Sequence, residues 1–199
     1  MIVHNVAQMS YEWQKLKLGK VSGTRLKDLV GSKKIELACK LIAEIETQEI
    51  EEGFINDKMQ RGIDTEPIAA DKFTEVTGIE LMEVGFIEST KWGFIGNSPD
   101  RYFKNDFTEA VEIKCPDTKK HVYYIVTNNW SEYKHQIASY FIANNDLEKL
   151  HFMSFDPRFT IKPYHITTIY RDEIDFEYYN KQIDAFAEIL DEKYELIKF

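Results

Sequence analysis

Apolar residues recur with two different spacings along this chain. Up to about residue 76 they recur every three to four residues, the spacing of amphipathic helices. This predicts helices at residues 12–18, 23–30, 34–49 and 58–76, with Gly78 as the C-cap of the last one. From residue 79 the pattern becomes an alternation of two, which predicts strands at 79–88, 92–96, 101–104, 107–115, 149–155 and 161–169.

Further helices are predicted between and after these strands, at 118–127, at 131–143 and from about 172 to 197. The segment 97–100, Asn-Ser-Pro-Asp, predicts a turn. This order of elements predicts an α/β fold with a central mixed β-sheet flanked by helices. No linker or repeat divides the chain. We therefore expect a single domain over 1–199, with N-terminal helices at about 10–76, a sheet with helices at about 79–169 and a C-terminal helix.

Composition narrows the class of protein. Apolar residues make up 43% and charged residues 30% of the chain, which is typical of a soluble globular protein. Because no apolar run approaches the ~20 residues needed to cross a bilayer, we expect a cytoplasmic protein without a membrane partner. The two cysteines lack metal-ligand spacing, and the five histidines lack the pairing on a helix that a zinc hydrolase needs.

The formal charge of −9 taken alone argues against nonspecific nucleic-acid binding, which needs clustered Lys and Arg. It does not exclude an acidic site that holds metal ions, because the charge of the metals is missing from this sum. A local basic patch is still present, formed by Lys15, Lys17, Lys20, Arg25 and Lys27.

The segment 110–116, Ala-Val-Glu-Ile-Lys-Cys-Pro, is the most informative for function. Alternation along a strand puts Glu112 and Lys114 on one face and their apolar neighbours on the other. Asp100 precedes Glu112 by twelve residues, just after the predicted turn. A hairpin between the two flanking strands would bring Asp100 beside Glu112.

Hydrolysis of a phosphodiester needs two neighbouring carboxylates and a cation, which Asp100, Glu112 and Lys114 could supply. Two carboxylates bind Mg²⁺, which lowers the pKa of a bound water and polarises the phosphoryl group. A nearby lysine orients that water or offsets the charge that develops on phosphorus. The same three residues also fit an ordinary amphipathic strand with a solvated ion pair, so the pattern alone leaves both interpretations open.

One helical residue, Glu66, favours the catalytic interpretation. The predicted helix 58–76 carries an apolar stripe that includes Met59, Ile63, Ala70 and Phe73. Glu66 lies in this stripe, where a carboxylate is costly unless it meets a cation or a donor. Gln136 lies in the same way on the apolar face of the helix 131–143. The alternatives are a glutamate at the margin of its stripe and a core glutamine bonded to backbone.

Six blocks of sequence, in order, resemble the bacteriophage lambda exonuclease family, the YqaJ-like branch of the PD-(D/E)xK nucleases. The resemblance covers about residues 11–160. The blocks lie at residues 13–24, 59–67, 97–100, 111–116, 133–136 and 155–158.

This resemblance implies a role for each matching residue. Asp100 and Glu112, with the backbone carbonyl of Ile113, would be metal ligands, and Glu66 would support a second ion or its waters. Lys114 would be the catalytic lysine, and Gln136 would lie beside the scissile phosphate. The family grips the 5′-phosphate end with an arginine and hydroxyls.

Three residues here match those positions, namely Lys17, Thr24 and Ser98. Lys17 departs from the family's arginine, because lysine offers a point charge where arginine offers a planar fork. Arg25 is the residue expected to compensate.

The implied function is a Mg²⁺-dependent exonuclease, with two ions per site and Mn²⁺ as a substitute. It would degrade linear double-stranded DNA from 5′ ends as a trimeric ring and leave 3′ single strands for a strand-annealing recombinase. Alternatives are a restriction-type, Cas4-like or RecB-like nuclease, or a catalytically silent DNA-binding module. Two cysteines cannot build the cysteine cluster of the Cas4-like proteins.

Overall fold

The computed structural model describes residues 1–50 and 56–198 of the chain. The region up to residue 77 is helical, as the spacing of apolar residues predicts, except for one short first strand. The elements of this region are β1 (Ile2–His4), α1 (Tyr11–Leu16), α2 (Leu26–Val30), α3 (Lys34–Thr47) and α4 (Asp57–Thr77). Gly78 ends α4 with a φ of 73°, which confirms it as the C-cap.

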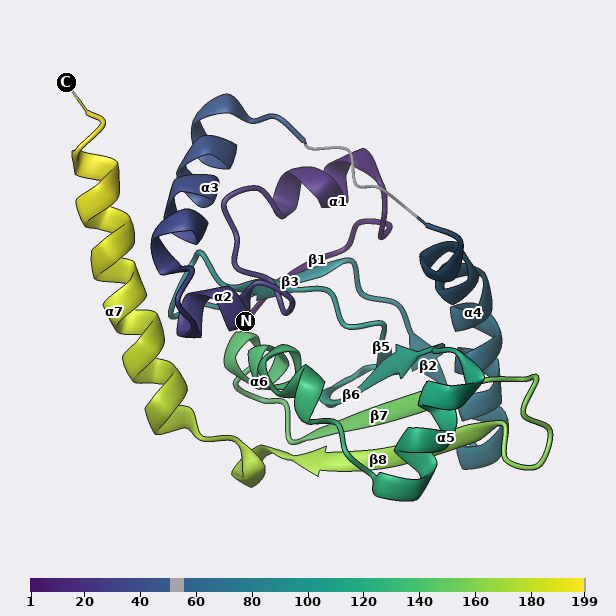
Figure 1. Cartoon of the computed structure of the whole chain (residues 1–199). Helices are drawn as coiled ribbons and strands as arrows, with labels where there is room; N and C mark the ends of the chain where they lie inside the picture. The colour runs from purple at the N-terminus through teal and green to yellow at the C-terminus, as the bar shows by residue number, and fades with distance from the viewer. Residues whose placement is uncertain (51–55, 199) are drawn as a thin grey trace.

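The rest of the chain supplies most of the strands, with helices inserted between them and appended after them (Figure 1). The strands are β2 (Leu81–Met82), β3 (Phe86–Glu88), β4 (Gly96–Asn97), β5 (Arg101–Phe103), β6 (Asp106–Lys114), β7 (Lys149–Phe155) and β8 (Tyr164–Tyr170). The helices are α5 (Thr118–Thr127), α6 (Lys134–Ala143) and α7 (Phe176–Glu195), with short 3-10 turns at Ser131–Tyr133 and Arg171–Glu173.

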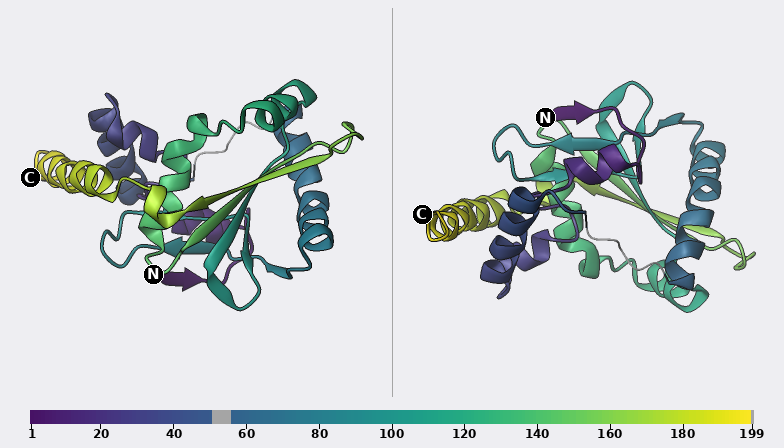
Figure 2. Two further views of the ribbon diagram at one scale, coloured as in Figure 1. Left: turned by 90° about the horizontal axis from the view of Figure 1, so that it is seen from below. Right: turned by 90° about the horizontal axis from the view of Figure 1, so that it is seen from above.

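The strands form two sheets. The larger has the order β2-β5-β6-β7-β8, in which β6 and β7 are parallel and the other pairs are antiparallel. The smaller has the order β1-β3-β4. Helix α4 covers one face of the larger sheet, and α5 and α6 lie on the other (Figure 2). The predicted α/β class, with a mixed sheet flanked by helices, is confirmed.

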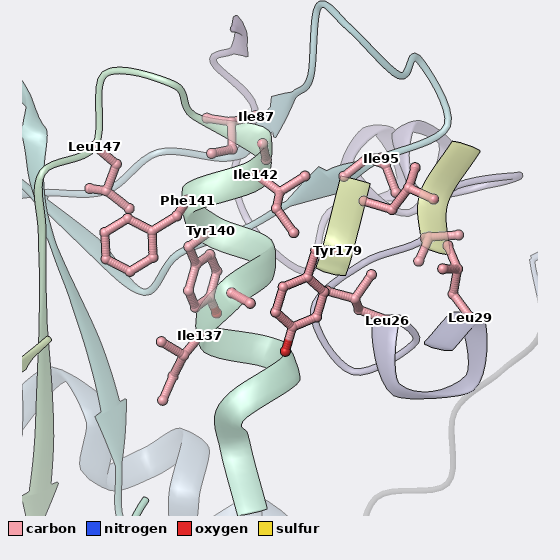
Figure 3. Packing of buried hydrophobic residues seen from close by; sticks show 14 of the residues in the cluster. Leu26, Leu29, Ile87, Ile95, Ile137, Tyr140, Phe141, Ile142, Leu147 and Tyr179 are labelled. Atoms are coloured by element: carbon pink, nitrogen blue, oxygen red, sulfur yellow. The ribbon is translucent and has the colours of Figure 1, made fainter. Parts of the chain in front are cut away.

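Alternation along β6 divides its side chains between two apolar cores. Val111 and Ile113 pack with Phe73 of α4, whereas Ala110 belongs to the larger core under α6. That larger core joins α6 to α2 and α7, as Tyr140, Leu26 and Tyr179 show in Figure 3. Glu112 therefore points away from α4, towards α6, with only 1% of its surface exposed.

Two strand predictions were wrong. Residues 79–88 do not form one strand, because the chain leaves the larger sheet after β2 and enters the smaller one at β3. At this crossing Gly85 lies so close to Val6 that an added Cβ would stand 2.1 Å from the Val6 carbonyl oxygen. Residues 92–96 are mostly a turn, which the backbone N–H of Ile95 closes by donating to the Trp92 carbonyl at 2.8 Å.

The apolar stripe predicted on α4 is only half buried. Ala70 and Phe73 are in the core, but Met59 is 50% and Ile63 43% exposed. The N-terminal half of the helix contributes these two residues to an open pocket instead of the core. No helix in the described part of the chain combines length with enough apolar character to span a bilayer.

Candidate active site

Asp100 and Glu112 lie side by side because β5 and β6 are antiparallel neighbours. Arg101 pairs with Val111, so Asp100 stands opposite Glu112, one step beyond the last pair of the ladder. Residues directly opposite each other have Cβ atoms about 4.5–5.5 Å apart. The backbone N–H of Ile113 donates to Asp100 Oδ2 at 2.6 Å. The structure thus brings together two of the predicted metal ligands.

The turn that carries Asp100 is fixed to α6. The Asn97 side chain donates to the Ser139 carbonyl at 2.8 Å, and the Ser139 hydroxyl donates to Asn97 Oδ1 at 3.1 Å. The Gln8 side chain donates to the carbonyl of Pro99 at 3.0 Å. Because these contacts hold the turn from both sides, Asp100 is placed without help from a regular strand.

Glu112 accepts hydrogen bonds from three side chains. Lys114 and Gln136 donate to its Oε1, the latter at 2.6 Å, and the Tyr140 hydroxyl donates to Oε2 at 2.5 Å. Gln136 and Tyr140 lie one turn apart on α6 and bond to each other at 3.0 Å. Gln136 is therefore neither bonded to backbone through its amide nor turned to solvent. Tyr140, which packs in the larger core, also contacts the site through its hydroxyl.

Electrostatics of the site are those of a buried acidic pair with one lysine. Burial raises the pKa of Asp100 well above its ordinary value, and the negative charge of Glu112 raises it further. Burial opposes the charge of Lys114, but Glu112 and Asp100 outweigh it and raise the pKa of that ammonium. Lys114 also lies over the Tyr133 ring, 5.2 Å from its centroid.

Glu66 lines the same pocket as Asp100 and is held by an arginine. Arg101 Nη1 donates to Glu66 Oε1 at 2.9 Å, and its other terminal nitrogen lies 3.1 Å from Glu83. Burial raises the pKa of Glu66, although Arg101 opposes the shift. A carboxylate in the apolar stripe needs a cation or a donor, and for Glu66 this partner is Arg101. Nothing in the sequence indicated that Arg101 pairs with Glu66. In the described part of the chain, no group of three or more His, Cys, Asp or Glu side chains is arranged to hold a metal.

Two pockets meet at Asp100. The first, which we call the loop pocket, has a volume of about 220 Å³ and is lined by Gln8, Trp13, Lys17, Ser22, Gly23, Thr24, Phe86, Asn97, Ser98, Asp100, Gln136 and Tyr140. The second, the helix pocket, has about 540 Å³ and is lined by Asn56, Lys58, Met59, Gly62, Ile63, Glu66, Asp100, Ile113, Lys114, Cys115, Pro116 and Tyr133. Both pockets are open to solvent.

The loop pocket gathers three of the four residues predicted to bind a terminal phosphate: Lys17, Thr24 and Ser98. Burial, followed by the charge of Arg25, lowers the pKa of Lys17 to about 8, while Glu44 opposes that shift. Arg25 itself is not in the pocket wall. Its guanidinium forms a two-pronged ion pair with Glu44, at 2.9 and 2.6 Å, and donates to the Lys20 carbonyl. These three bonds use three of the five N–H donors of the guanidinium, and the expectation that Arg25 compensates for Lys17 stays a prediction.

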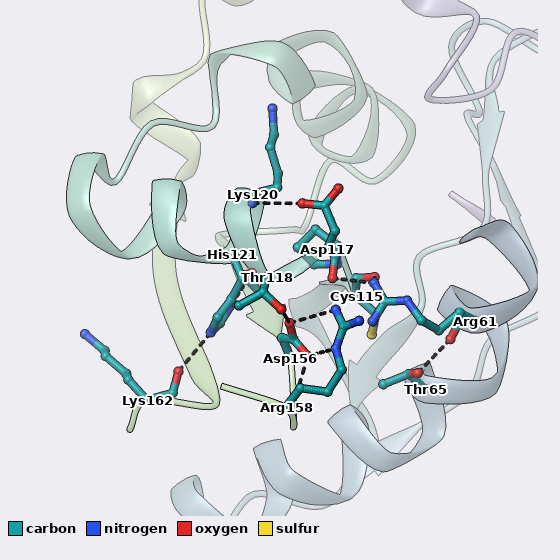
Figure 4. Close-up of polar contacts among 12 residues, drawn as sticks. Arg61, Thr65, Cys115, Asp117, Thr118, Lys120, His121, Asp156, Arg158 and Lys162 are labelled. Atoms are coloured by element: carbon teal, nitrogen blue, oxygen red, sulfur yellow. Dashed lines mark hydrogen bonds and ion pairs between the residues drawn. The ribbon is translucent and has the colours of Figure 1, made fainter. Parts of the chain in front are cut away.

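A second polar network fixes the chain just beyond Lys114 (Figure 4). Arg61 of α4 donates to the carbonyls of Cys115 and Pro116, the first at 2.8 Å. Asp156, fully buried at the end of β7, accepts from Arg158 at 2.8 and 2.9 Å and from the Thr118 hydroxyl at 2.6 Å. These bonds tie the ends of β6 and β7 to α4 and α5, so Lys114 lies at a rigid corner.

Comparison with known proteins identifies the family. The model of the YqaJ-like viral recombinase domain matches residues 12–144, about two thirds of the chain. The chain belongs to the YqaJ-like viral recombinase family. This confirms the resemblance to lambda-type exonucleases drawn from the six sequence blocks, all but the last of which lie within the matched residues. No curated protein matched the chain in sequence.

Solved structures agree with this family. An alkaline exonuclease from Laribacter hongkongensis is 30% identical, with a TM-score of 0.84 over 94% of this chain and 96% of the other. The same exonuclease in complex with dAMP gives a TM-score of 0.85 at 30% identity, over 95% and 96% of the two chains. A phage-related exonuclease from Haemophilus somnus 129PT is 14% identical, with a TM-score of 0.69 over 90% and 96%, and shows the shared fold.

Proposed function

We propose that this protein is a divalent-metal-dependent exonuclease that degrades linear double-stranded DNA from 5′ ends. The observation that carries the proposal is the position of Asp100, which lines both pockets. On one side of Asp100, the loop pocket offers a phosphate the ammonium of Lys17 and the hydroxyls of Thr24 and Ser98. On the other side, the helix pocket contains Glu66 and Lys114. A pocket for a terminal phosphate directly beside the cleavage centre leaves room for a short end of the strand, which favours removal of nucleotides from an end over cutting within a duplex.

The donor set fits a hard divalent cation. Asp100 and Glu112 supply carboxylate oxygens, the ligands that Mg²⁺ and Mn²⁺ prefer, and the Ile113 carbonyl is the adjacent backbone oxygen. Burial, followed by repulsion from Glu112, raises the pKa of Asp100, and a bound cation would offset both effects. When bound, such an ion would lower the pKa of a bound water and offset charge on the phosphoryl oxygens. We propose Mg²⁺ as this ion, with Glu66 available to a second one.

The chain's own residues position the reacting groups. Lys114 keeps its proton beside Glu112 and thus offers a fixed positive charge where negative charge develops on the phosphate. Gln136 and Tyr140 hold the Glu112 carboxylate in one orientation. Lys17, Thr24 and Ser98 would bind the 5′-phosphate of the strand being degraded. The dAMP bound to the Laribacter relative is a nucleotide with such a phosphate, which supports this reading.

Membership of the family supports a proposal for the wider role. We propose that the enzyme leaves 3′ single strands for a strand-annealing recombinase, works as a ring-shaped trimer around DNA and acts in the cytoplasm, in the bacterial host if it is encoded by a phage. The whole chain would form one nuclease domain. The solution mass tests the trimer directly, because a ring of three copies must have three times the mass of the chain.

A strand-specific digestion tests the activity. Linear duplexes labelled at the 3′ end of one strand, with either a 5′-phosphate or a 5′-hydroxyl on that strand, are incubated with Mg²⁺ or with EDTA. We expect loss of the labelled strand from its 5′ end, release of mononucleotides, and no reaction in EDTA. Closed circular DNA is the matched control: its cleavage would indicate a restriction-type enzyme, and degradation from 3′ ends would overturn the proposed direction.

A further inference from the structure

Trp13 touches two of the three proposed phosphate-binding residues. It lies on α1, whose N-cap Ser10 accepts from the Trp13 backbone N–H at 3.2 Å. Its indole Nε1–H donates to Ser98 Oγ at 2.7 Å, across 85 residues of sequence, and to the Gly85 carbonyl at 3.0 Å. Lys17 follows one helical turn later, and its Nζ lies 3.7 Å from the centroid of the Trp13 ring. Trp13 itself lines the loop pocket.

The bond to Ser98 fixes the polarity of that hydroxyl. A serine hydroxyl has one proton to donate and two lone pairs to accept with. Because the indole can only donate, Ser98 Oγ must accept from it. Its own proton is then left for another acceptor, and the oxygens of a phosphate are acceptors that need donors. Trp13 thereby turns Ser98 into a donor towards the loop pocket.

The contact with Lys17 acts on the ammonium group. A cation over the face of an indole is attracted by the ring, most strongly where water is excluded. This contact uses none of the three N–H donors of the ammonium, so they stay free for phosphate oxygens. A lysine without such support would swing over many rotamers, because its stem is flexible.

We infer that Trp13 is the positioning residue of the terminal-phosphate pocket, selecting a 5′-phosphate over a 5′-hydroxyl by orienting the Ser98 proton and seating the Lys17 ammonium. The inference rests on the proposed function and goes beyond it, since it names the residue through which Lys17 and Ser98 act together. A purely structural role for Trp13, through its bond to Gly85, would slow digestion of both kinds of end alike.

Substitution of the indole separates these roles. Trp13→Phe keeps a ring beside Lys17 but removes the N–H. We expect the ratio of initial rates on 5′-phosphate and 5′-hydroxyl ends to fall about tenfold, the scale of one lost hydrogen bond to a charged group. Ser98→Ala should lower the ratio by a similar factor. The double variant should be no worse than Ser98→Ala alone, because both changes remove the same donor. Additive losses, or an unchanged ratio in Trp13→Phe, would overturn the inference.

Trp92→Phe is the matched control. Its indole also donates a hydrogen bond, to Asp184 of α7 at 2.8 Å, but it lines neither pocket. We expect the ratio of this variant to equal that of the wild type. A loss as large as that of Trp13→Phe would mean that the ratio reports general loosening of the fold, and the inference would be wrong.

A binding measurement covers the case in which Trp13→Phe does not fold. The tryptophan fluorescence of the wild-type protein in EDTA is titrated with dithymidine carrying a 5′-phosphate or a 5′-hydroxyl. We expect a change with the phosphorylated probe alone, and its loss in Lys17→Ala. Equal or absent responses would contradict the role of Trp13. Because no cleavage is needed, this result stands apart from the proposed function, which fails if the wild-type protein digests neither end.

Discussion

The loop pocket and the helix pocket share Asp100 but are held together by different interactions. Two charged groups that line the helix pocket have a partner of opposite charge in contact with them: Lys114 pairs with Glu112, and Glu66 pairs with Arg101. In the loop pocket, by contrast, neutral groups from distant segments orient the polar side chains, as Trp13 does for Ser98. The cleavage chemistry therefore depends on fixed charges, and recognition of the strand end depends on hydrogen-bond direction.

This difference predicts two kinds of variant. Changes among the charges should abolish cleavage on every kind of end, because they remove the groups on which the chemistry acts. Changes in the loop pocket should alter the preference between ends and leave part of the activity. The largest losses of activity should therefore come from changes at Asp100, which lines both pockets, and in the helix pocket. The smallest should come from changes in the backbone of the loop pocket.

The largest loss is expected for Asp100→Asn and Lys114→Ala. Each removes a charge on which the chemistry depends, so digestion of both kinds of end should fall roughly 10³-fold or more. Thermal unfolding should still be cooperative, because both groups face an open pocket. Mn²⁺ should raise the melting temperature of the wild type and not that of Asp100→Asn. Near-normal digestion by either variant would remove that residue from the proposed mechanism.

Tyr140→Phe should cost less. The change deletes the hydrogen bond to Glu112 Oε2 and keeps the ring in the core. Loss of a bond to a charged group costs about 1.5–3 kcal/mol, which predicts a rate reduction of roughly 10- to 100-fold. Both kinds of end should be affected equally, since Glu112 serves the cleavage step. A change confined to the end preference would instead mean that the Tyr140 hydroxyl acts on binding of the strand end and not on Glu112.

The preference for a 5′-phosphate should depend on pH through Lys17. Its pKa of about 8 means that the free enzyme loses this positive charge as pH rises through that value, while the phosphate is already doubly charged above about pH 6. The ratio of kcat/KM for phosphate and hydroxyl ends should therefore fall as pH rises from about one unit below to about one unit above that pKa. In Lys17→Ala the ratio should be low throughout. Lys17→Arg should keep it high, because the guanidinium stays charged.

The smallest effect is expected for Gly23→Ala. An added Cβ would stand 2.9 Å from Gln136 Cγ and 3.1 Å from Ser139 Oγ, so the loop must move away from α6. We expect a modest loss of the end preference and a lower melting temperature, as for mild overpacking. Gly62→Ala on α4 is the matched comparison, because its Cβ meets nothing within 4 Å. That variant should gain about 0.5–1 kcal/mol of stability from helix propensity. A stabilised Gly23→Ala would show that the loop has room to spare.

The sequence by itself determined the side chains that strand alternation controls. Because neighbours on a strand point to opposite faces, the segment 111–115 already separated Glu112 from the apolar residues that pack on α4. The turn before Asp100 and the C-cap at Gly78 follow from equally local rules. The family resemblance added the loop-pocket residues, which no local pattern connects.

Only the tertiary structure decided how far each local pattern is buried and which partners it meets. Met59 and Ile63 share a helical stripe with Phe73, yet they are exposed, because burial depends on what lies opposite and not on period. The sequence did not indicate a partner for Arg25, but in the folded chain its guanidinium forms two hydrogen bonds to Glu44. The bond from Trp13 to Ser98 joins residues 85 positions apart. Such contacts depend on the packing of whole elements, which periodicity along the chain does not encode.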